Sequence, residues 1–595
     1  MLDPRAEYAR RLEIHEASVA RRERQHIRAG NAKLAVAAAA LALVCVFFAK
    51  HVSGYWLILP AVAFIVLAIV HEQVLRARTH ARTAAAFYRA GFARMEDRWS
   101  GTGASGERFR DSAHVYGDDL DLFGRGCLFE LLSTARLPMG ENRLAEWLLQ
   151  PSPVRAIVDR QVLVAELSAK GDLRESVAIV GEDLRVRLNP ESLTKWCEEK
   201  SLLVGTGLRI LCAALSLAVI VTLYICFTTA NYEALLAVLF VEAILYTWLH
   251  KRARALIEGV NANAEGLELF AKILLRIEQE PFSSPQLQQR IAALKQAPES
   301  ASRAVRRFAR TVDWIDGHDS LVARLLNLPM LYTIQTALAA EAWRKRHGYH
   351  MRAWIDAIGE IEALLSLATY SFEHPADPFP EFVDAPDAPP LFAGDDLGHP
   401  LIPAAQCVPN TVRLDSSTRV LLVSGSNMSG KSTLLRTVGI NAVLAQAGAP
   451  IRGKALRLTP LALGTRLHSV DSLQEGRSTF YTEVLRIRQV LDLAGGSRPS
   501  LFLFDELLDG TNSHDRRIGA ESLLRAFIER GAVGIVTTHD LALTEMAASL
   551  GGIVRNVHLQ DYIENGQMRF DYKLREGVVT KSNALELMRL AGLDV

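Results

Sequence analysis

Residues 420–438 read VLLVSGSNMSGKSTLLRTV, which joins a short apolar run, a glycine-bounded loop and the start of a helical pattern. The loop has the spacing GxxxxGKS over 425–432, in the strand–loop–helix context of a phosphate-binding loop. Its glycines allow backbone N–H groups to turn toward phosphate oxygens, and the following helix adds the positive end of its dipole. We therefore predict that Lys431 reaches the β- and γ-phosphates of a nucleotide and that the Ser432 hydroxyl holds Mg²⁺. The loop residues predicted to bind ATP are Gly425, Ser426, Asn427, Met428, Ser429, Gly430, Lys431, Ser432 and Thr433.

Two later strands are predicted to bring polar side chains to the same site. Residues 501–504 (LFLF) form an apolar strand that ends in Asp505 and Glu506, and the run 533–538 ends in front of His539. Asp505 suits coordination of Mg²⁺, and Glu506 suits polarisation of the attacking water. His539 can sense the γ-phosphate or orient water, because parallel strands bring their carboxyl ends to one edge of a sheet. The predicted chemistry is Mg²⁺-dependent ATP binding and hydrolysis, with catalytic residues Glu506, Lys431 and His539 and metal ligands Ser432 and Asp505.

Composition narrows the class of protein around this site. The chain has 595 residues with Lys+Arg 67 against Asp+Glu 66, which excludes a polybasic protein that binds through bulk charge. A mean hydropathy of +0.11 with 22% charged residues is too apolar for a disordered chain and high for a soluble enzyme. The six cysteines are scattered without a CxxC pair, so we expect reduced, buried thiols and neither a zinc nor a haem site.

Four nearly charge-free runs account for the apolar surplus. They occupy residues 34–49, 55–70, 210–227 and 235–249, and they form two pairs separated by short links. The first two runs have 16 residues each, or about 24 Å of helix, which approaches the ~30 Å hydrocarbon core of a bilayer. The alternative is a pair of buried hairpins in a soluble protein, but such helices would show a polar face. We predict two transmembrane hairpins, at 34–70 and 205–250.

Flanking charge predicts the topology of these hairpins. Lysines and arginines cluster before and after each pair of runs, whereas among these residue types the linking loops carry only Lys50. The positive-inside rule then predicts a multi-pass protein of the cell membrane, with both termini and the ATPase domain in the cytoplasm. Glu242 lies inside the fourth run; it is either a functional intramembrane carboxylate or a protein-facing residue, and we favour the second interpretation.

The remaining segments differ in composition and in the spacing of their apolar residues. Residues 1–33 are a basic helix, 71–117 a helix followed by a Gly/Ser-rich linker at 100–107, and 118–372 a helical region that the second hairpin interrupts. Within this region, 355–368 reads as an amphipathic helix. A proline-rich connector at 373–390 should break any regular element. From 391 to 595, short β-branched runs alternate with helical stretches, which predicts an α/β domain with a parallel sheet.

At this point the motifs carry a family resemblance. The segment GSNMSGKSTLLRTVG resembles the nucleotide loop of the DNA mismatch repair MutS family, which reads GPNMGGKST. The resemblance covers about 385–595, and a weaker likeness at 138–161 points to the start of the family's core and lever domain. Further segments that carry it are Asp471-Ser472-Leu473, Ser478-Thr479-Phe480 with Glu483, Asp505-Glu506, Gly510-Thr511-Asn512-Ser513, Thr538-His539, Asn556-Val557-His558 and the closing run at 570–593.

The resemblance implies a composite ATPase that works as a homodimer, with an ABC/MutS-like P-loop domain and an all-α core/lever domain. It supports ATP–Mg²⁺ binding by the loop, and it implies that His558 lies near the adenine. Cys407 stands where the family usually stacks an aromatic residue on adenine. The residues implied to act across the dimer interface are Ser478, Thr479, Phe480, Thr511, Asn512 and Ser513.

Two hypotheses for function remain open. Kinship implies a membrane-anchored ATPase of DNA mismatch repair, binding mismatched or damaged double-stranded DNA. Nothing before residue 118 resembles a mismatch-reading domain, and the second hairpin occupies the place of the family's DNA clamp in the lever. The alternative is therefore an ATP-driven conformational switch with a protein or lipid partner. Four arginines at helical spacing contact DNA phosphates without reading sequence or form a solvated face: Arg303, Arg306, Arg307 and Arg310.

Overall fold

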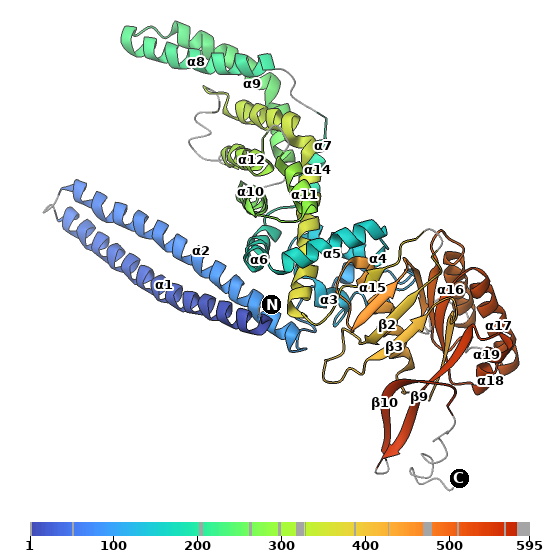
Figure 1. The fold of residues 1–595 in the computed structure, drawn as a ribbon. Helices are drawn as coiled ribbons and strands as arrows, with labels where there is room; N and C mark the ends of the chain where they lie inside the picture. Colours follow the sequence, from blue (N-terminus) through green and yellow to red (C-terminus); the bar gives the residue numbers. More distant parts are fainter. Residues whose placement is uncertain are drawn as a thin grey trace.

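The structure is a computed structural model. It describes residues 3–49, 53–200, 206–260, 264–295, 299–316, 327, 329–385, 388–426, 428–467, 479–508, 511–564 and 567–579. A long N-terminal hairpin and an elongated helical region join a C-terminal α/β domain (Figure 1).

The N-terminal hairpin consists of two antiparallel helices, α1 (Pro4–Phe48) and α2 (Ile58–Met95), joined through a short 3-10 turn at Gly54–Leu57. Asp3 caps α1 by accepting a hydrogen bond from the Arg5 N–H, and Pro4 suits the first helical position. The basic segment and the first apolar run are thus one continuous helix. The polar halves pair beside the helical region, while the apolar halves extend freely (Figure 1).

The helical region is organised around α14 (Tyr332–Glu373), whose 42 residues span about 63 Å. A hairpin of two apolar helices, α8 (Thr206–Thr229) and α9 (Glu233–Gly259), extends from the end where α14 begins (Figure 1). Six further helices pack on α14: α3 (Leu128–Leu132), α4 (Pro138–Leu149), α5 (Val154–Ser168), α6 (Gly171–Arg185), α7 (Pro190–Glu198) and α12 (Ala301–Asp316). An outer pair packs on these helices: α10 (Ala264–Gln279) on α12 and α6, and α11 (Pro285–Lys295) on α10 and α5.

The amphipathic interpretation of 355–368 is wrong for its second half. From Ile361 to Tyr370 every residue of α14 is buried, because helices pack around α14 on all sides there. Leu, Ala and small hydroxyl residues fill those positions, and each serine or threonine hydroxyl bonds a carbonyl one turn earlier in α14, as Ser366 does with Glu362 O.

Four helices in the described part of the chain are long and apolar enough to cross a membrane: α1, α2, α8 and α9. Their apolar side chains are largely exposed, for example Leu59 and Phe240 at 67% and 68%. Glu242, in contrast, is fully buried on the protein-facing side of α9, and Cys212 and Val219 of α8 are buried as well.

The α/β domain contains two sheets. The larger has the order β10-β9-β4-β8-β7-β6, and the smaller has the order β1-β5-β2-β3. The larger sheet is mixed rather than parallel throughout, because β10 returns antiparallel to β9 as a hairpin while the other neighbours run parallel. Its strands are β4 (Val420–Ser424), β6 (Ala462–Arg466), β7 (Ser500–Phe504), β8 (Val533–Thr538), β9 (Val554–Glu564) and β10 (Gln567–Glu576).

The connector at 373–390, which was expected to contain no regular element, includes a strand of the smaller sheet. Its strand β1 (Glu381–Phe382) lies inside 373–390 and pairs in parallel with β5 (Ala455–Leu458), so the prolines flank a regular element there. The remaining strands are β2 (Phe392–Leu397) and β3 (Asn410–Leu414). The helices of the domain are α15 (Lys431–Ala447), α16 (Thr479–Leu493), α17 (Ser513–Glu529), α18 (Leu541–Thr544) and α19 (Met546–Ser549).

The segment predicted as a linker is packed instead. Gly103 N–H donates to the Glu130 carboxylate, and Gly106 adopts a positive φ against the rings of Phe123 and Phe129. Just beyond it, Val115 O accepts a hydrogen bond from Thr465 N–H of β6. Residues before 118 therefore belong to the contact between the helical region and the α/β domain.

Candidate functional site

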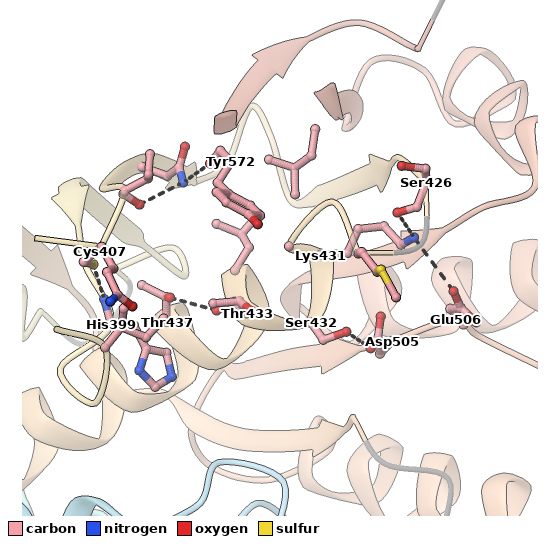
Figure 2. A pocket seen from close by; sticks show the side chains of 18 residues that line it. His399, Cys407, Ser426, Lys431, Ser432, Thr433, Thr437, Asp505, Glu506 and Tyr572 are labelled. Carbon is pink, nitrogen blue, oxygen red and sulfur yellow. Dashed lines mark hydrogen bonds and ion pairs between the residues drawn. The ribbon is translucent and has the colours of Figure 1, made fainter. Parts of the chain in front are cut away.

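A cavity of about 740 Å³ lies where β4 runs into α15 (Figure 2). The described residues of the loop 425–430, the first turn of α15, the end of β7 and Leu559 of β9 form one side. The other side comes from the segment 399–410 and from Tyr572 of β10. This is the carboxyl edge of the larger sheet, where parallel α/β sheets bind their ligands.

The loop backbone is held in a conformation suited to phosphate. Gly430 has φ of 95° and Met428 of 73°, and Gly430 is the N-cap of α15. A Cβ on Gly425 would lie 2.7 Å from Ser429 Oγ and 2.9 Å from Leu559 O, so only glycine fits there. Asn427 lies outside the described residues.

Lys431 is folded back over its own loop. Its Nζ donates to Gly425 O at 2.9 Å and to Ser426 O at 3.1 Å, and only 5% of the residue is exposed. Burial lowers the pKa of Lys431, and the carboxylates of Glu506 and Asp505 oppose this shift. The ammonium group is thus positioned at the mouth of the loop, where incoming phosphate oxygens can replace the carbonyl partners.

A second cluster joins the helix to the strand ends. The Ser432 hydroxyl donates to one Asp505 oxygen, and the Thr537 hydroxyl donates to the other. Glu506 N–H in turn donates to Thr537 Oγ1 at 3.0 Å. Thr537, which the sequence analysis did not single out, therefore aligns both acidic residues of the strand end.

Glu506 faces the loop from the opposite wall. Its carboxylate lies 3.2 Å from His539 Nδ1 and 3.8 Å from Lys431 Nζ. Glu506 has φ of 50°, a left-handed conformation that is costly for a residue with a Cβ and that recurs at functional sites. The structure therefore brings together five of the predicted residues: Lys431, Ser432, Asp505, Glu506 and His539.

The loop and the strand end fit a Mg²⁺–triphosphate. No group of three or more His, Cys, Asp or Glu side chains in the described ranges could hold a metal ion without other ligands. Mg²⁺ commonly takes one carboxylate, a hydroxyl and substrate phosphates, which matches Asp505 and Ser432. The hydroxyl oxygens of Ser426 and Ser429 are buried without a hydrogen-bond partner, as expected for a cradle that awaits an anion.

The wall of the cavity away from the phosphate loop contains Cys407 but not His558. Cys407 lines the wall, and its Sγ accepts the His399 N–H at 3.3 Å (Figure 2). His558, which the resemblance places near the adenine, is not among the residues that line this cavity: its Nδ1 lies 3.1 Å from Gly577 O, while the neighbouring Leu559 lines the wall. Side chains alternate between the two faces of a strand, so a shift of one residue moves a side chain out of the site.

Tyr572 is a pocket residue that the sequence analysis missed. Its ring lies 2.9 Å from the position of a Cβ on Gly430, so it overhangs the phosphate loop. Asn410 holds it in place by donating to Tyr572 O and accepting from Leu574 N–H, at 2.9 and 2.7 Å. The signal was the second aromatic residue of the motif FDYKL, but only the fold shows that β10 crosses the loop.

Of the six residues predicted to act across a dimer interface, the five that the structure describes lie at or just before the starts of two helices. Phe480 is in the first turn of α16, and Asn512 caps α17 by accepting the Asp515 N–H at 2.9 Å, with Thr511 just before it. Leu508 N–H donates to the buried Glu483 carboxylate of α16, which brings the two helix starts together. Thr479 and Ser513 are described for their backbone only, and Ser478 lies outside the described residues.

Comparison with known proteins identifies the C-terminal part. Residues 421–595 match the family described as MutS domain V. The chain is 34% identical over 188 residues to the DNA mismatch repair protein MutS of Streptococcus uberis, covering 31% of this chain and 22% of that protein. It is 31% identical over 278 residues to MutS of Streptococcus pneumoniae serotype 19F, covering 46% and 32%. The DNA mismatch repair protein HexA of Streptococcus pneumoniae serotype 4 matches with the same identity and coverage.

The fold and the site together define a P-loop protein, with the phosphate loop between β4 and α15 and acidic residues at the end of β7. Within this class, residues 421–595 resemble MutS domain V, and the relatives with 31–34% identity are DNA mismatch repair proteins. The chain matches a third or less of the length of these relatives.

Proposed function

We propose that this protein is a Mg²⁺-dependent ATPase whose nucleotide site drives movement of helical hairpins seated in the cell membrane. The observation that carries the enzymatic part is the arrangement around the loop: Lys431 at its mouth, Ser432 bonded to Asp505, and Glu506 between His539 and Lys431.

Each side chain has a distinct role in this proposal. Lys431 exchanges its carbonyl partners for phosphate oxygens, and Ser432 with Asp505 holds Mg²⁺. Glu506 accepts a proton from the attacking water, and His539 orients the carboxylate. Bound Mg²⁺ supplies charge stabilisation of the phosphate oxygens during transfer.

A continuous set of contacts supports coupling between the nucleotide and α14. Arg160 of α5 donates to Ala447 O, the last carbonyl of α15, at 2.7 Å. Its guanidinium also lies 3.9 Å from the ring centre of Trp147 on α4. Both α4 and α5 pack against α14, so a shift of the phosphate-loop helix displaces the elements that hold α14.

The membrane part rests on the apolar helices. The exposed apolar ends of α1, α2, α8 and α9 need a lipid environment, since contiguous apolar surface of this extent is unfavourable in water. With the basic residues on the cytoplasmic side, both termini and the ATPase domain lie in the cytoplasm. By kinship the active form is a homodimer in which the starts of α16 and α17 face the partner's nucleotide.

The test measures ATP binding and phosphate release with the full chain in detergent. We expect Mg²⁺-dependent turnover that EDTA abolishes, and a loss of ATP binding of at least tenfold in Lys431→Ala. Lys454→Ala removes an exposed lysine of the same domain and serves as the matched control. Unchanged ATP capture by Lys431→Ala would refute the site, whereas extraction of the protein from membranes by alkaline carbonate would refute the membrane seat.

A second candidate function is binding of double-stranded DNA. It is favoured by the relatives, which are named DNA mismatch repair proteins. A salt-dependent mobility-shift assay with homoduplex and mismatched duplex tests it, together with ATP turnover in the presence of each. If neither duplex binds or changes turnover, the repair function is excluded and the membrane switch remains.

A further inference from the structure

The outer face of α12 carries a stripe of three arginines and a tryptophan. Arg303, Arg307, Arg310 and Trp314 recur at i, i+4, i+7 and i+11, so they share one side of the helix, and all four are exposed. The opposite side is buried against α10 and α14. Arg307 pairs with Glu299 at 3.1 Å, whereas neither Arg303 nor Arg310 has a carboxylate partner in the described ranges.

The stripe continues onto α14. Burial lowers the pKa of His347, Glu299 opposes this shift, and Arg346 and Arg307 lower the pKa further. Arg307 of α12 and the buried His347 of α14 share the Glu299 carboxylate, at 3.1 and 3.2 Å, and Arg346, next to His347 in the sequence, is exposed. The resulting surface is a basic face built from two helices that the ATPase site does not use.

The outer face of α12 lies on the same side of α14 as the two apolar hairpins. In Figure 1, α10 and α12 are on the side of α14 toward which both apolar hairpins extend. The stripe faces away from α14, because α12 buries its other side there.

The end of α12 is also tied to the base of the second hairpin. Tyr332 Oη donates to Trp314 O at 2.6 Å, and one turn further along α14 the Gln335 amide donates to Ser216 Oγ of α8 at 2.9 Å. Trp314 is 61% exposed, and tryptophan favours the boundary between headgroups and acyl chains.

We propose that the outer face of α12 docks on the membrane surface and binds the phosphate groups of anionic phospholipids. Guanidinium groups bind phosphate in a bidentate manner, and a polybasic surface near a bilayer prefers anionic lipids. The inference rests on the proposed membrane seat of the hairpins. Duplex DNA is disfavoured, because it would have to enter between this face and the bilayer.

The test uses the full chain in nanodiscs of phosphatidylcholine alone or with 30% phosphatidylglycerol. A fluorophore introduced as an unnatural residue at Asp313, beside the stripe, reports proximity through quenching by headgroup nitroxide lipids. We expect at least twofold stronger quenching in the anionic discs. The triple variant Arg303→Glu/Arg307→Glu/Arg310→Glu should abolish this difference, whereas a matched triple variant on the ATPase domain should keep it: Arg488→Glu/Arg525→Glu/Arg530→Glu.

The outcomes separate the inference from the function beneath it. If the protein resists carbonate extraction but quenching is the same in both discs, the docking face is wrong and the membrane seat stands. If carbonate extracts the protein, both are overturned. If a 30-bp duplex binds the detergent-solubilised chain and the α12 triple variant weakens that binding at least tenfold, the face is a DNA surface and the lipid proposal is overturned.

Discussion

Replacing Glu506 by glutamine separates ATP capture from ATP cleavage. The glutamine amide has the shape of the carboxylate, so it keeps the contacts of the side chain with the wall of the cavity. It removes the negative charge that lies 3.8 Å from Lys431 Nζ, while its amide oxygen can still accept a hydrogen bond from His539 Nδ1, which lies 3.2 Å from the carboxylate. The variant therefore cannot accept a proton from water.

The expected loss of hydrolysis rate follows from the role of Glu506 as a general base. A positioned general base contributes about 10²- to 10⁴-fold to a rate, which corresponds to an activation free energy about 3–5 kcal/mol higher without it. The affinity of the variant for ATP should rise or stay unchanged. Removing a carboxylate beside the phosphate site lowers its repulsion of the triphosphate and leaves Lys431 free to bind it.

The assay pairs single-turnover hydrolysis with equilibrium ATP binding in Mg²⁺. We expect Glu506→Gln to hydrolyse ATP at least 100-fold more slowly while its Kd stays within threefold of wild type or falls. Glu545→Gln, an exposed acid of the same domain, should leave both unchanged. A Glu506→Gln rate within threefold of wild type would mean that another group activates the water.

Three further predictions concern stability and pH. Arg94→Met removes the bidentate partner of the fully buried Glu373 carboxylate, which should lower the free energy of unfolding by about 3–5 kcal/mol. The double variant Arg94→Met/Glu373→Leu should recover most of the melting temperature in detergent. Equal losses in both variants would contradict this prediction. Gly534→Ala puts a Cβ 2.4 Å from the Phe502 ring in the centre of the sheet, so the ATPase domain should lose about 1–3 kcal/mol, and an unchanged melting temperature would show that the ring can move. Burial lowers the pKa of His399 from 6.5 to about 4, with the charge of a nearby arginine as a smaller cause, so the unfolded chain binds more protons between these values. Stability should then fall by about 3 kcal/mol as the pH drops from 6.5 to 4, a slope that melting curves should not show in His399→Gln.

The position of the phosphate loop could be predicted from the sequence alone. Its conformation depends on local spacing, glycines and a helix start, so the residues of 425–433 that the structure describes lie where the motif predicts. Asp505 and His539 were also predictable, since each ends an apolar strand and parallel strands end at one edge. In contrast, the motif around His558 does not say which face of β9 each side chain occupies, so only the fold shows that Leu559 lines the cavity.

The helical region shows the opposite case. An amphipathic pattern over 355–368 was a reasonable expectation for a surface helix, but neighbours of this part of α14 come from distant segments, as in the bond from Thr134 N–H to Ser366 Oγ across 232 residues of sequence. Packing from distant segments decides burial there. No local window contains that information.

The amino-acid sequence alone determined the chemistry of the loop, the two pairs of apolar helices and the family of the C-terminal domain, because each depends on residues that are close in the chain. Tertiary structure decided how these parts relate. It brought Tyr572 over the phosphate loop, linked α15 through Arg160 to the helices that pack on α14, and placed α12 on the side of α14 toward which the hairpins extend. Such relations depend on contacts between segments hundreds of residues apart, whose geometry is set only when the whole core packs.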